Sequence, residues 1–211
     1  MTLALVGVAC ARGERELFSD VNLELQGGDA LHVVGANGSG KTTLLRCLCG
    51  LLSPLSGEVR WQGLAIKNNR ETFARDLLYL GHSIGLKDDL LSWENLVARS
   101  TIAGQTIGRA AAYQALEENG LADLAELPVG VLSQGQRKRV SLCSLSTNQV
   151  AKLWILDEPF SALDKPTVDA LCVKLAAHLQ KGGILIYTTH QKIDLRASRA
   201  LTLDLDGSAV C

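Results

Sequence analysis

The strongest candidate for chemistry is a glycine-rich loop at residues 35–42 with the sequence GANGSGKT. It matches the pattern G-x-x-x-x-G-K-[ST] at every specified position, and it follows an apolar run at residues 30–34 that predicts a buried strand. In such a loop the backbone N–H groups surround phosphate oxygens, Lys41 brings positive charge to the β- and γ-phosphates, and the Thr42 hydroxyl is a ligand for Mg²⁺. A glycine-rich turn that only caps a helix does not require Gly40, Lys41 and Thr42 in this order. The loop therefore predicts phosphate binding.

Two adjacent acids, Asp157 and Glu158, follow an apolar run at residues 153–156. A carboxylate at the carboxyl end of a strand in an α/β sheet faces the crevice where ligands bind. In phosphoryl transfer, Asp157 would hold Mg²⁺ and Glu158 would orient and deprotonate the attacking water. Taken alone, two acids at this position are as typical of a solvated loop as of a catalytic site. The glycine-rich loop upstream favours the catalytic interpretation.

A second candidate anion site is the LSQGQ loop, residues 132–136, which precedes a predicted helix with a basic first turn. Ser133 and Gly135 would expose backbone amides at the helix start. The alternative is an ordinary serine cap, although positive charge near a helix N-terminus is electrostatically unfavourable. His190, after a predicted strand at residues 184–188, is a further candidate, although an isolated histidine is more often structural unless a phosphate lies within reach.

The elements that position these residues alternate between strand and helix at both ends of the chain and are helical in its middle. Strands are predicted at residues 3–11, 30–34, 153–156 and 184–188, helices at 41–52 and 166–180, and hairpins at 58–66 and 201–210. Helical spacing occurs at residues 90–100, 107–119 and 136–146. The pattern predicts an α/β fold with a mostly parallel core sheet and a small antiparallel β subdomain. It also predicts one domain over residues 1–211, with a helical subdomain inserted at residues 84–148.

Composition excludes several classes of function. The chain has 211 residues, 21 Lys plus Arg against 22 Asp plus Glu, and only 4% aromatic residues. It therefore lacks the broad basic surface and the stacking residues of nucleic-acid-binding proteins, and we expect no nucleic-acid partner. Its apolar runs are far shorter than the roughly 20 residues of a membrane-spanning helix, so we expect that the chain itself does not cross a membrane.

The cysteines and the other histidines predict structural roles. The 6 Cys are scattered, without a CxxC pair or the paired histidines of a zinc site, which is typical of small apolar fillers in a reducing compartment. Cys47 and Cys49 are two apart on a predicted helix and point to different sides. His32 falls in a predicted strand and His178 in a predicted helix, so neither is expected to bind a ligand.

In their order and spacing, five segments resemble the ATPase domain of ABC transporters. They are GANGSGKT at 35–42, LSQGQ at 132–136, LWILDEP at 153–159, SALD at 161–164 and His190. The resemblance covers nearly the whole chain. It implies a P-loop NTPase fold of the ABC ATPase type and an ATPase, a translocase that hydrolyses ATP to ADP and phosphate with Mg²⁺. It also implies a homodimer in which two such domains pack head to tail.

The same resemblance implies roles for individual residues. ATP would be bound by Gly35, Ala36, Asn37, Gly38, Ser39, Gly40, Lys41, Thr42 and Thr43. The residues implied in catalysis are Lys41, Glu158 as general base and His190 as γ-phosphate sensor, with Thr42 and Asp157 holding Mg²⁺. Those implied in contacts across the dimer are Ser133, Gln134, Gly135 and Gln136, which would reach the γ-phosphate bound by the other chain, and Asp164, for communication between the sites.

Two departures from the ABC pattern stand out. At the loop joining the two lobes the family usually has glutamine, and counting back from residues 94–96 the equivalent position here is His82. The family also stacks adenine on an aromatic residue between the first two strands. Residues 8–16 contain none, which leaves Arg12 as a candidate for contact with the base.

Local strings also resemble a narrower group, the ATPase subunits of the haem exporters of cytochrome c maturation. They are GHSIGLK at 81–87, LWILDEPF at 153–160 and TTHQ at 188–191. In that group histidine is usual at the lobe-joining loop. The resemblance implies a subunit at the cytoplasmic face of the inner membrane, attached through integral membrane permease subunits, which powers haem delivery or release of a haem-loaded chaperone.

Other assignments and the docking surface stay open on the sequence. The alternatives are the ATPase subunit of another small ABC exporter and a soluble, non-transport ABC ATPase. The family places the surface that receives the membrane subunits around residues 82–99, where Leu86, Leu90, Leu91 and Trp93 form an apolar set. The competing interpretation is that this set only builds the core of the helical lobe.

Overall fold

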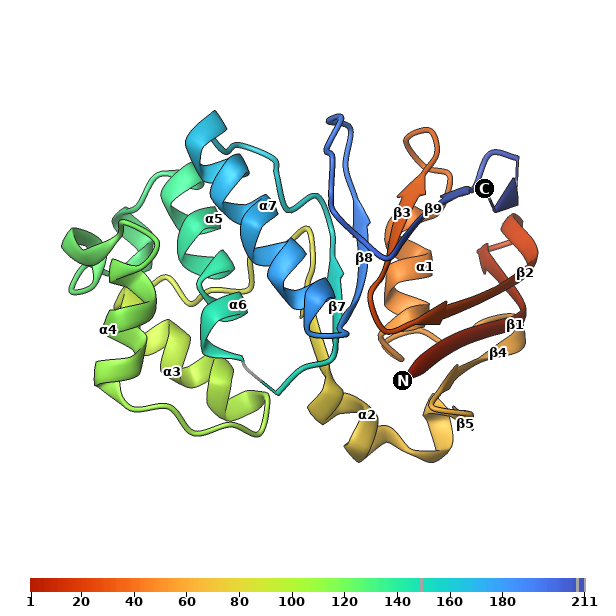
Figure 1. Ribbon diagram of the computed structural model, residues 1–211, viewed down its shortest axis with the longest axis horizontal. Helices are drawn as coiled ribbons and strands as arrows, with labels where there is room; N and C mark the ends of the chain where they lie inside the picture. The colour runs from red at the N-terminus through yellow and green to blue at the C-terminus, as the bar shows by residue number, and fades with distance from the viewer. Residues whose placement is uncertain (149, 208, 211) are drawn as a thin grey trace.

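A six-stranded sheet forms the centre of the computed structural model, which describes residues 1–148, 150–207 and 209–210 (Figure 1). Its strands, in the order β10-β9-β3-β8-β7-β6, are β10 (Ala209–Val210), β9 (Arg199–Asp204), β3 (Asp29–Val34), β8 (Ile184–Thr188), β7 (Leu153–Leu156) and β6 (Leu77–Leu80). All neighbours pair in parallel except β10 with β9. Every residue of β7 and β8 is buried, as expected of strands covered on both faces. The predicted parallel core sheet is confirmed.

A second, antiparallel sheet contains β2 (Arg15–Gln26), β1 (Thr2–Arg12), β4 (Ser56–Trp61) and β5 (Leu64–Ala65), in that order. The turn between β4 and β5 places Gln62 at φ 51° and Gly63 at φ 81°. Two successive left-handed residues match the right-handed twist of a tight hairpin, which explains why Gly63 suits the second position. The small antiparallel sheet and its hairpin are as predicted.

Helices cover both faces of the central sheet. On one face, between the two sheets, lies α1 (Lys41–Leu48), whose Leu44, Leu45 and Leu48 are fully buried in a core shared with both sheets. On the other face lies α7 (Lys165–Gln180), which buries Leu171, Leu175 and Leu179 against β7 and β8 (Figure 1). Their spacing of four residues keeps one helix face on the sheet.

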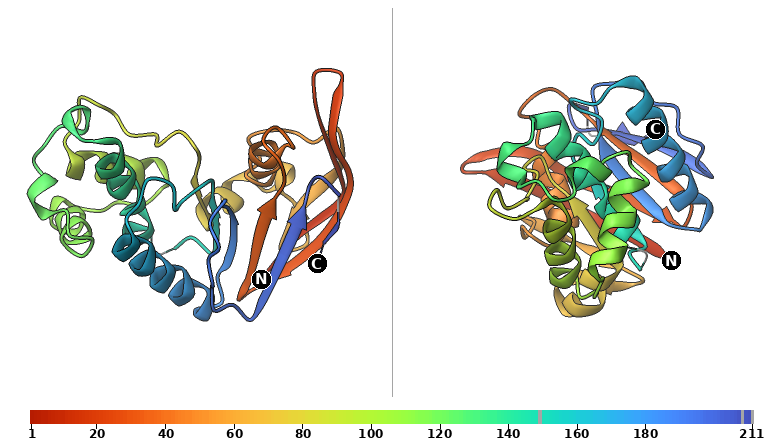
Figure 2. Two further views of the ribbon diagram at one scale, coloured as in Figure 1. Left: turned by 90° about the horizontal axis from the view of Figure 1, so that it is seen from above. Right: turned by 90° about the vertical axis from the view of Figure 1, so that its left-hand side faces the viewer.

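The middle of the chain forms a helical region with its own core. Its helices are α3 (Ser92–Ile102), α4 (Arg109–Glu117), α5 (Gln134–Leu142) and α6 (Ser144–Thr147). Buried residues from these helices and their loops, among them Leu96, Leu116, Val129 and Val140, pack together apart from the sheet cores. A short helix, α2 (Arg70–Asp76), leads from the antiparallel sheet into β6. Seen from above, the helical region and the antiparallel sheet lie at opposite ends of the molecule (Figure 2).

Some boundaries differ from the predicted ones. The helix that starts at Lys41 ends at Leu48 instead of residue 52, because Gly50 takes a left-handed conformation at φ 70° and closes it. The segment predicted as one helix over residues 136–146 is two, α5 and α6, which meet at Cys143. The predicted ranges do not include β2, α2 and β6. No helix of the described residues is long and apolar enough to span a membrane.

Candidate functional site

The glycine-rich loop joins β3 to α1 at the carboxyl edge of the central sheet. A side chain at Gly40, which has φ 108°, would place its Cβ 3.2 Å from Leu17 and Phe18 of β2. Glycine is therefore required here both by the left-handed backbone and by the close approach of β2. Gly40 also precedes the first turn of α1, whose leading N–H groups have no intrahelical partner. Loop and helix start together form a site that can surround an anion with amides.

The glycine-rich loop is held by contacts that the sequence analysis did not foresee. Lys41 Nζ donates to the carbonyl oxygens of Gly35, at 2.6 Å, and Ala36, at 3.0 Å. The Ala36 N–H donates to the carboxylate of Asp206, at 2.7 Å, from the turn between β9 and β10. The sequence around Asp206 predicts only a turn. Because Ala36 and Asp206 are 170 residues apart, no local sequence pattern predicts their hydrogen bond.

The two predicted Mg²⁺ ligands lie side by side. Thr42 Oγ1 donates to Asp157 Oδ2 at 3.0 Å, and Thr188 Oγ1 donates to Asp157 Oδ1 at 2.8 Å. A hydroxyl and a carboxylate are oxygen ligands of the kind that Mg²⁺ prefers. The described residues contain no group of three or more His, Cys, Asp or Glu side chains placed to hold a metal ion. This donor set fits a Mg²⁺ ion that shares its coordination with substrate phosphates and water, as such ions usually do.

Glu158 sits directly beyond β7 in an unusual backbone conformation. Its φ of 50° is left-handed, which is costly for a residue with a long side chain. Three side chains hold its backbone: its N–H donates to Thr188 Oγ1, and its carbonyl accepts from Lys138 Nζ and Ser161 Oγ, each at 2.9 Å. Burial lowers the pKa of Lys138.

The side chain of Glu158 faces His190. Glu158 Oε1 lies 3.6 Å from His190 Nε2, and within the described part of the chain this buried oxygen accepts no hydrogen bond. A buried carboxylate oxygen without a partner is suited to accept from a ligand or a water molecule. The edge of the sheet thus brings together Lys41, Thr42, Asp157, Glu158 and His190 from three separate parts of the sequence.

The LSQGQ loop uses its polar groups to cap its own helix. Ser133 Oγ accepts from the Gln136 N–H at 3.3 Å, and the Ser133 N–H donates to Gln136 Oε1 at 2.9 Å, which is a reciprocal capping box at the start of α5. Ser133 and Gln134 are exposed, and Gly135 is half-buried. Among the described residues no hydrogen bond joins this loop to the glycine-rich loop.

Asp164 and His82 lie at the start of α7 and in the loop after β6, respectively. Asp164 caps α7, with its Oδ1 accepting from the Thr167 N–H at 3.1 Å, and these hydrogen bonds hold the pKa of Asp164 below its usual range. His82 is exposed in the loop after β6. The Leu80 carbonyl at the end of β6 accepts from the Asp157 N–H at 2.8 Å, so this loop leaves the sheet beside Asp157.

The two other histidines of the described strands and helices stack on aromatic rings. His178 stacks on Trp154, with ring centroids 3.9 Å apart, and His32 stacks on Tyr187 at 4.8 Å but also lines a pocket with Lys41 and His190, so its structural role stays a prediction. Burial lowers the pKa of His178 to about 4. Arg12 is exposed at the tip of the β1–β2 hairpin.

The cysteines within the described residues are free thiols, and most of them are buried. These are Cys10, Cys47, Cys49, Cys143 and the half-buried Cys172, whereas Cys211 lies outside the described residues. Cys10 and Cys47 contact each other within the core between the two sheets, with their sulfurs 3.0 Å apart. Burial in the core is consistent with the predicted role as small apolar fillers.

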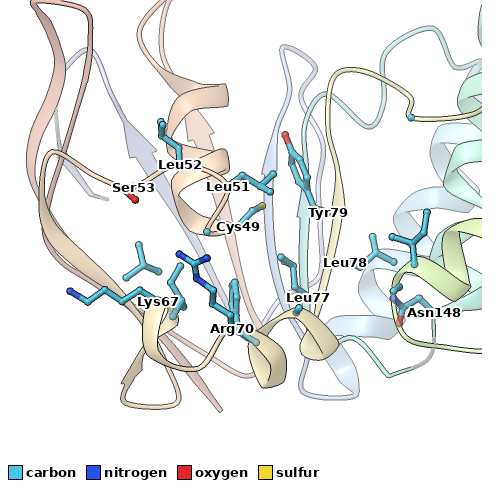
Figure 3. A pocket seen from close by; sticks show the side chains of 18 of the residues that line it. Cys49, Leu51, Leu52, Ser53, Lys67, Arg70, Leu77, Leu78, Tyr79 and Asn148 are labelled. Atoms are coloured by element: carbon cyan, nitrogen blue, oxygen red, sulfur yellow. The ribbon is translucent and has the colours of Figure 1, made fainter.

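A groove of about 750 Å³ runs between the antiparallel-sheet end and the helical region. Figure 3 shows apolar Leu51 and Leu52 above basic Lys67 and Arg70 on one side, Asn148 on the opposite wall, and Leu77 between the two walls. The helical wall includes Arg99 and Ile102 of α3. The apolar set predicted for docking does not line this groove. Leu86 and Trp93 instead pack against the core of the helical region, as the competing interpretation expected.

Sequence comparisons identify relatives over most of the chain. The profile described as ABC transporter matches residues 18–161, more than half of the chain. The cytochrome c biogenesis ATP-binding export protein CcmA of Dechloromonas aromatica (strain RCB) is 45% identical over 93% of this chain and 96% of its own length. The protein of the same name from Nitrosospira multiformis is 44% identical, over 97% of this chain and 98% of its own.

Solved structures show the same fold. A dimeric bacterial ABC transporter cassette superimposes with a TM-score of 0.82 at 23% identity, over 96% of this chain and 94% of the cassette. The ATP-binding subunit of another ABC transporter superimposes with a TM-score of 0.78 at 25% identity, over 90% of this chain and 80% of that subunit. The likeness to the first shows the fold alone.

Proposed function

This chain belongs to the ABC transporter family, and we propose that it is the ATP-hydrolysing subunit of the export complex of cytochrome c maturation. The observation that carries the hydrolytic part is the cluster at the edge of the central sheet, where the Thr42 hydroxyl meets Asp157 and Glu158 faces His190. The export part is supported by relatives that are 41–48% identical to this chain and share one name.

In the proposed reaction the glycine-rich loop binds the phosphates of ATP through its amides, and Lys41 contributes positive charge to the β- and γ-phosphates. Thr42 and Asp157 would hold Mg²⁺, which would neutralise charge on the phosphates. Glu158 accepts a proton from the attacking water through the carboxylate oxygen that lacks a partner in the described chain. His190, beside Glu158, contacts the γ-phosphate.

A second copy of the chain completes each site in this proposal. The LSQGQ loop of one chain, Ser133 to Gln136, reaches the phosphate bound by the other, and Asp164 connects the two sites. Support comes from the exposure of Ser133 and Gln134, whose loop makes no described hydrogen bond to the glycine-rich loop of its own chain. Residues 84–148 form the helical subdomain that carries this loop, a division supported by the separate core of the helices.

The groove between the two ends of the molecule is the proposed docking site for integral membrane permease subunits. Its exposed apolar side chains, Leu51 at 66% and Ile102 at 87% exposure, lie beside Lys67, Arg70 and Arg99. Such a surface fits a short cytoplasmic helix with an apolar face and acidic ends. The subunit would then lie at the cytoplasmic face of the inner membrane, held there by its partners.

The proposal is tested by capturing the complex. We expect Glu158→Gln to bind ATP, to hydrolyse it about 100-fold or more slowly, and to trap the closed dimer, because the amide cannot take up the proton. The tagged variant is purified in mild detergent with ATP, and mass spectrometry identifies the membrane proteins that accompany it. Native turnover in this variant would contradict the role of Glu158.

Each result of the capture experiment separates the candidate functions. Recovery of cytochrome c maturation membrane subunits supports the proposal. An unrelated permease would favour another small ABC exporter, and ribosomes or the absence of membrane proteins would favour a soluble ABC ATPase. Leu51→Asp in the groove should abolish recovery, whereas the control Val173→Asp, on α7 and 71% exposed outside the groove, should not.

A further inference from the structure

A buried threonine joins the two acids at the end of β7. Thr188, the last residue of β8, is fully buried. Its Oγ1 donates to Asp157 Oδ1 at 2.8 Å and accepts from the Glu158 N–H at 2.9 Å. We propose that Thr188 is a positioning residue for ATP hydrolysis, whose hydroxyl holds the carboxylate of Asp157 and the backbone of Glu158 in one fixed arrangement. The inference rests on the proposed hydrolytic function and adds a residue to it.

Only a hydroxyl satisfies both neighbours. The Asp157 carboxylate can only accept a hydrogen bond and the Glu158 N–H can only donate one, so the bridging group must donate and accept at a single atom. Thr188 does so at 0% exposure, where water does not reach in to replace a lost partner. Valine has nearly the same shape as threonine and can satisfy neither neighbour. The pair of contacts is therefore specific to the hydroxyl.

The backbone of Glu158 depends on this support. At φ 50° the residue is held against its own preference, and its carbonyl already accepts from Lys138 and Ser161. The Thr188 hydroxyl is the partner of its N–H, on the side of β8. If this contact is lost, the peptide can relax and the carboxylate moves relative to the phosphate site. Small displacements of a catalytic group reduce rates strongly while leaving the binding of substrate intact.

The hydroxyl of Thr188 also completes a continuous chain of contacts. Thr42 at the start of α1 bonds one oxygen of Asp157, Thr188 bonds the other, and Thr188 bonds the Glu158 amide. The phosphate-binding helix, the carboxylate implied in metal binding and the general base are thereby linked across β7 and β8. A shift of the Asp157 carboxylate is transmitted to Glu158 through one atom.

The test compares Thr188→Val with Thr188→Ser in the 211-residue chain, alone and in its membrane complex. We expect Thr188→Val to lower kcat about tenfold or more, with KM for ATP within threefold of the native value, because the base is misplaced while the phosphate loop is intact. Thr188→Ser, which retains the hydroxyl, should recover kcat to within threefold. Thr202→Val, on β9 of the same sheet, is the matched control for loss of a strand threonine and should leave both constants unchanged.

Three results would overturn the inference. They are native kcat in Thr188→Val, an equal loss in Thr188→Ser, and a rise in KM that accompanies a lowered melting temperature, which would indicate a purely structural role. Absence of hydrolysis in the native chain, with and without its partners, would contradict the proposed function itself and the inference with it. The native control therefore distinguishes the two failures.

Discussion

The chain contains two loops suited to bind an anion. They differ in whether distant parts of the chain or only neighbouring residues hold them by hydrogen bonds. Around the glycine-rich loop, Thr42 bonds Asp157, the Ala36 amide bonds Asp206, and Lys41 bonds carbonyls of the loop itself. In the LSQGQ loop the capping box closes on Ser133 and Gln136 alone. The first loop is braced, that is, held by hydrogen bonds to residues that follow the strands β7 and β9. The second loop is held only by hydrogen bonds at the start of its own helix, α5.

This difference suits the two loops to different roles, one in binding ATP and the other in completing the site of a second chain. A loop braced from several strands can hold its amides in place before any ligand arrives, which reduces the ordering cost of binding. A loop capped only by its own helix is free to dock on another surface without breaking contacts in its own chain. The braced loop therefore suits ATP binding by the single chain, and the exposed loop suits the proposed contact across the dimer.

The largest effect is expected from Lys41→Ala. Removal of the ammonium group takes away the charge proposed to meet the β- and γ-phosphates, and we expect ATP affinity to fall about 100-fold or more, with hydrolysis lost. Equilibrium binding of a fluorescent ATP analogue measures the change. The matched control is Lys181→Ala at the exposed end of α7, which should bind as the native chain does. Unchanged affinity in Lys41→Ala would mean that the braced loop is not the phosphate site.

Two changes at Ser133 separate its role as a helix cap from its proposed contact with a phosphate. Ser133→Ala removes the cap of α5 and should lower the free energy of unfolding by about 1 kcal/mol, whereas Ser133→Asp is itself a good cap and should preserve it. Both should slow hydrolysis by about tenfold or more and leave ATP binding to the single chain intact, because in the proposed dimer the serine contacts the phosphate bound by the partner. Melting curves and turnover are measured together. Native turnover in Ser133→Asp would rule out an approach of this loop to a phosphate.

A smaller effect is expected where the C-terminal hairpin touches the glycine-rich loop. Asp206→Ala removes the acceptor of the Ala36 N–H and should raise KM for ATP about threefold, at nearly constant kcat, because the loop loses one brace out of several. Asp206→Asn keeps an acceptor oxygen and should stay near the native KM. Equal behaviour of the two variants in steady-state kinetics would show that the brace does not depend on this hydrogen bond.

The smallest effect on activity, with a clear effect on stability, is expected at His178. Burial lowers its pKa to about 4 in the folded chain, against an ordinary value of 6.5. Below pH 6.5 the unfolded chain binds a proton that folded His178 does not, so the free energy of unfolding decreases as the pH falls from 6.5 towards 4. The loss reaches about 3 kcal/mol at most. Above pH 6.5 the full stability is present.

Replacing that ring tests the assignment of the pH dependence. His178→Phe keeps an aromatic ring against Trp154 and cannot take up a proton. Urea unfolding at a series of pH values should give a shallower decline between pH 6.5 and 4 for this variant, with ATPase activity at neutral pH close to native. An unchanged slope would assign the pH dependence to other groups.

Short-range sequence patterns predicted those parts of the site whose residues are neighbours in the sequence. The glycine-rich loop, the cap at Ser133 and the acids after β7 follow from short-range patterns, and the strands β3, β7 and β8 follow from apolar runs. Thr188 and Asp206 were missed as site residues because their partners lie 31 and 170 residues away, and a threonine in a strand or an aspartate in a turn carries no sign of such contacts. The strand β6 was missed although Leu77–Leu80 is an apolar run after Asp76, because four residues are too few for their spacing to distinguish a strand from a turn of helix.

The separation along the chain between the partners of these hydrogen bonds sets the order in which the bonds can form during synthesis. Thr42 leaves the ribosome 115 residues before Asp157, and Ala36 leaves it 170 residues before Asp206. At synthesis rates of about 5–20 residues per second, the hydrogen bond between Ala36 and Asp206 can form only roughly 10 to 30 seconds after the glycine-rich loop is synthesised. The nucleotide site is therefore among the last features that a nascent chain can assemble. Fragments that end before Asp157 lack the contacts of both Thr42 and Ala36 with distant residues, so we expect ATP to stabilise the nearly finished chain more than earlier fragments.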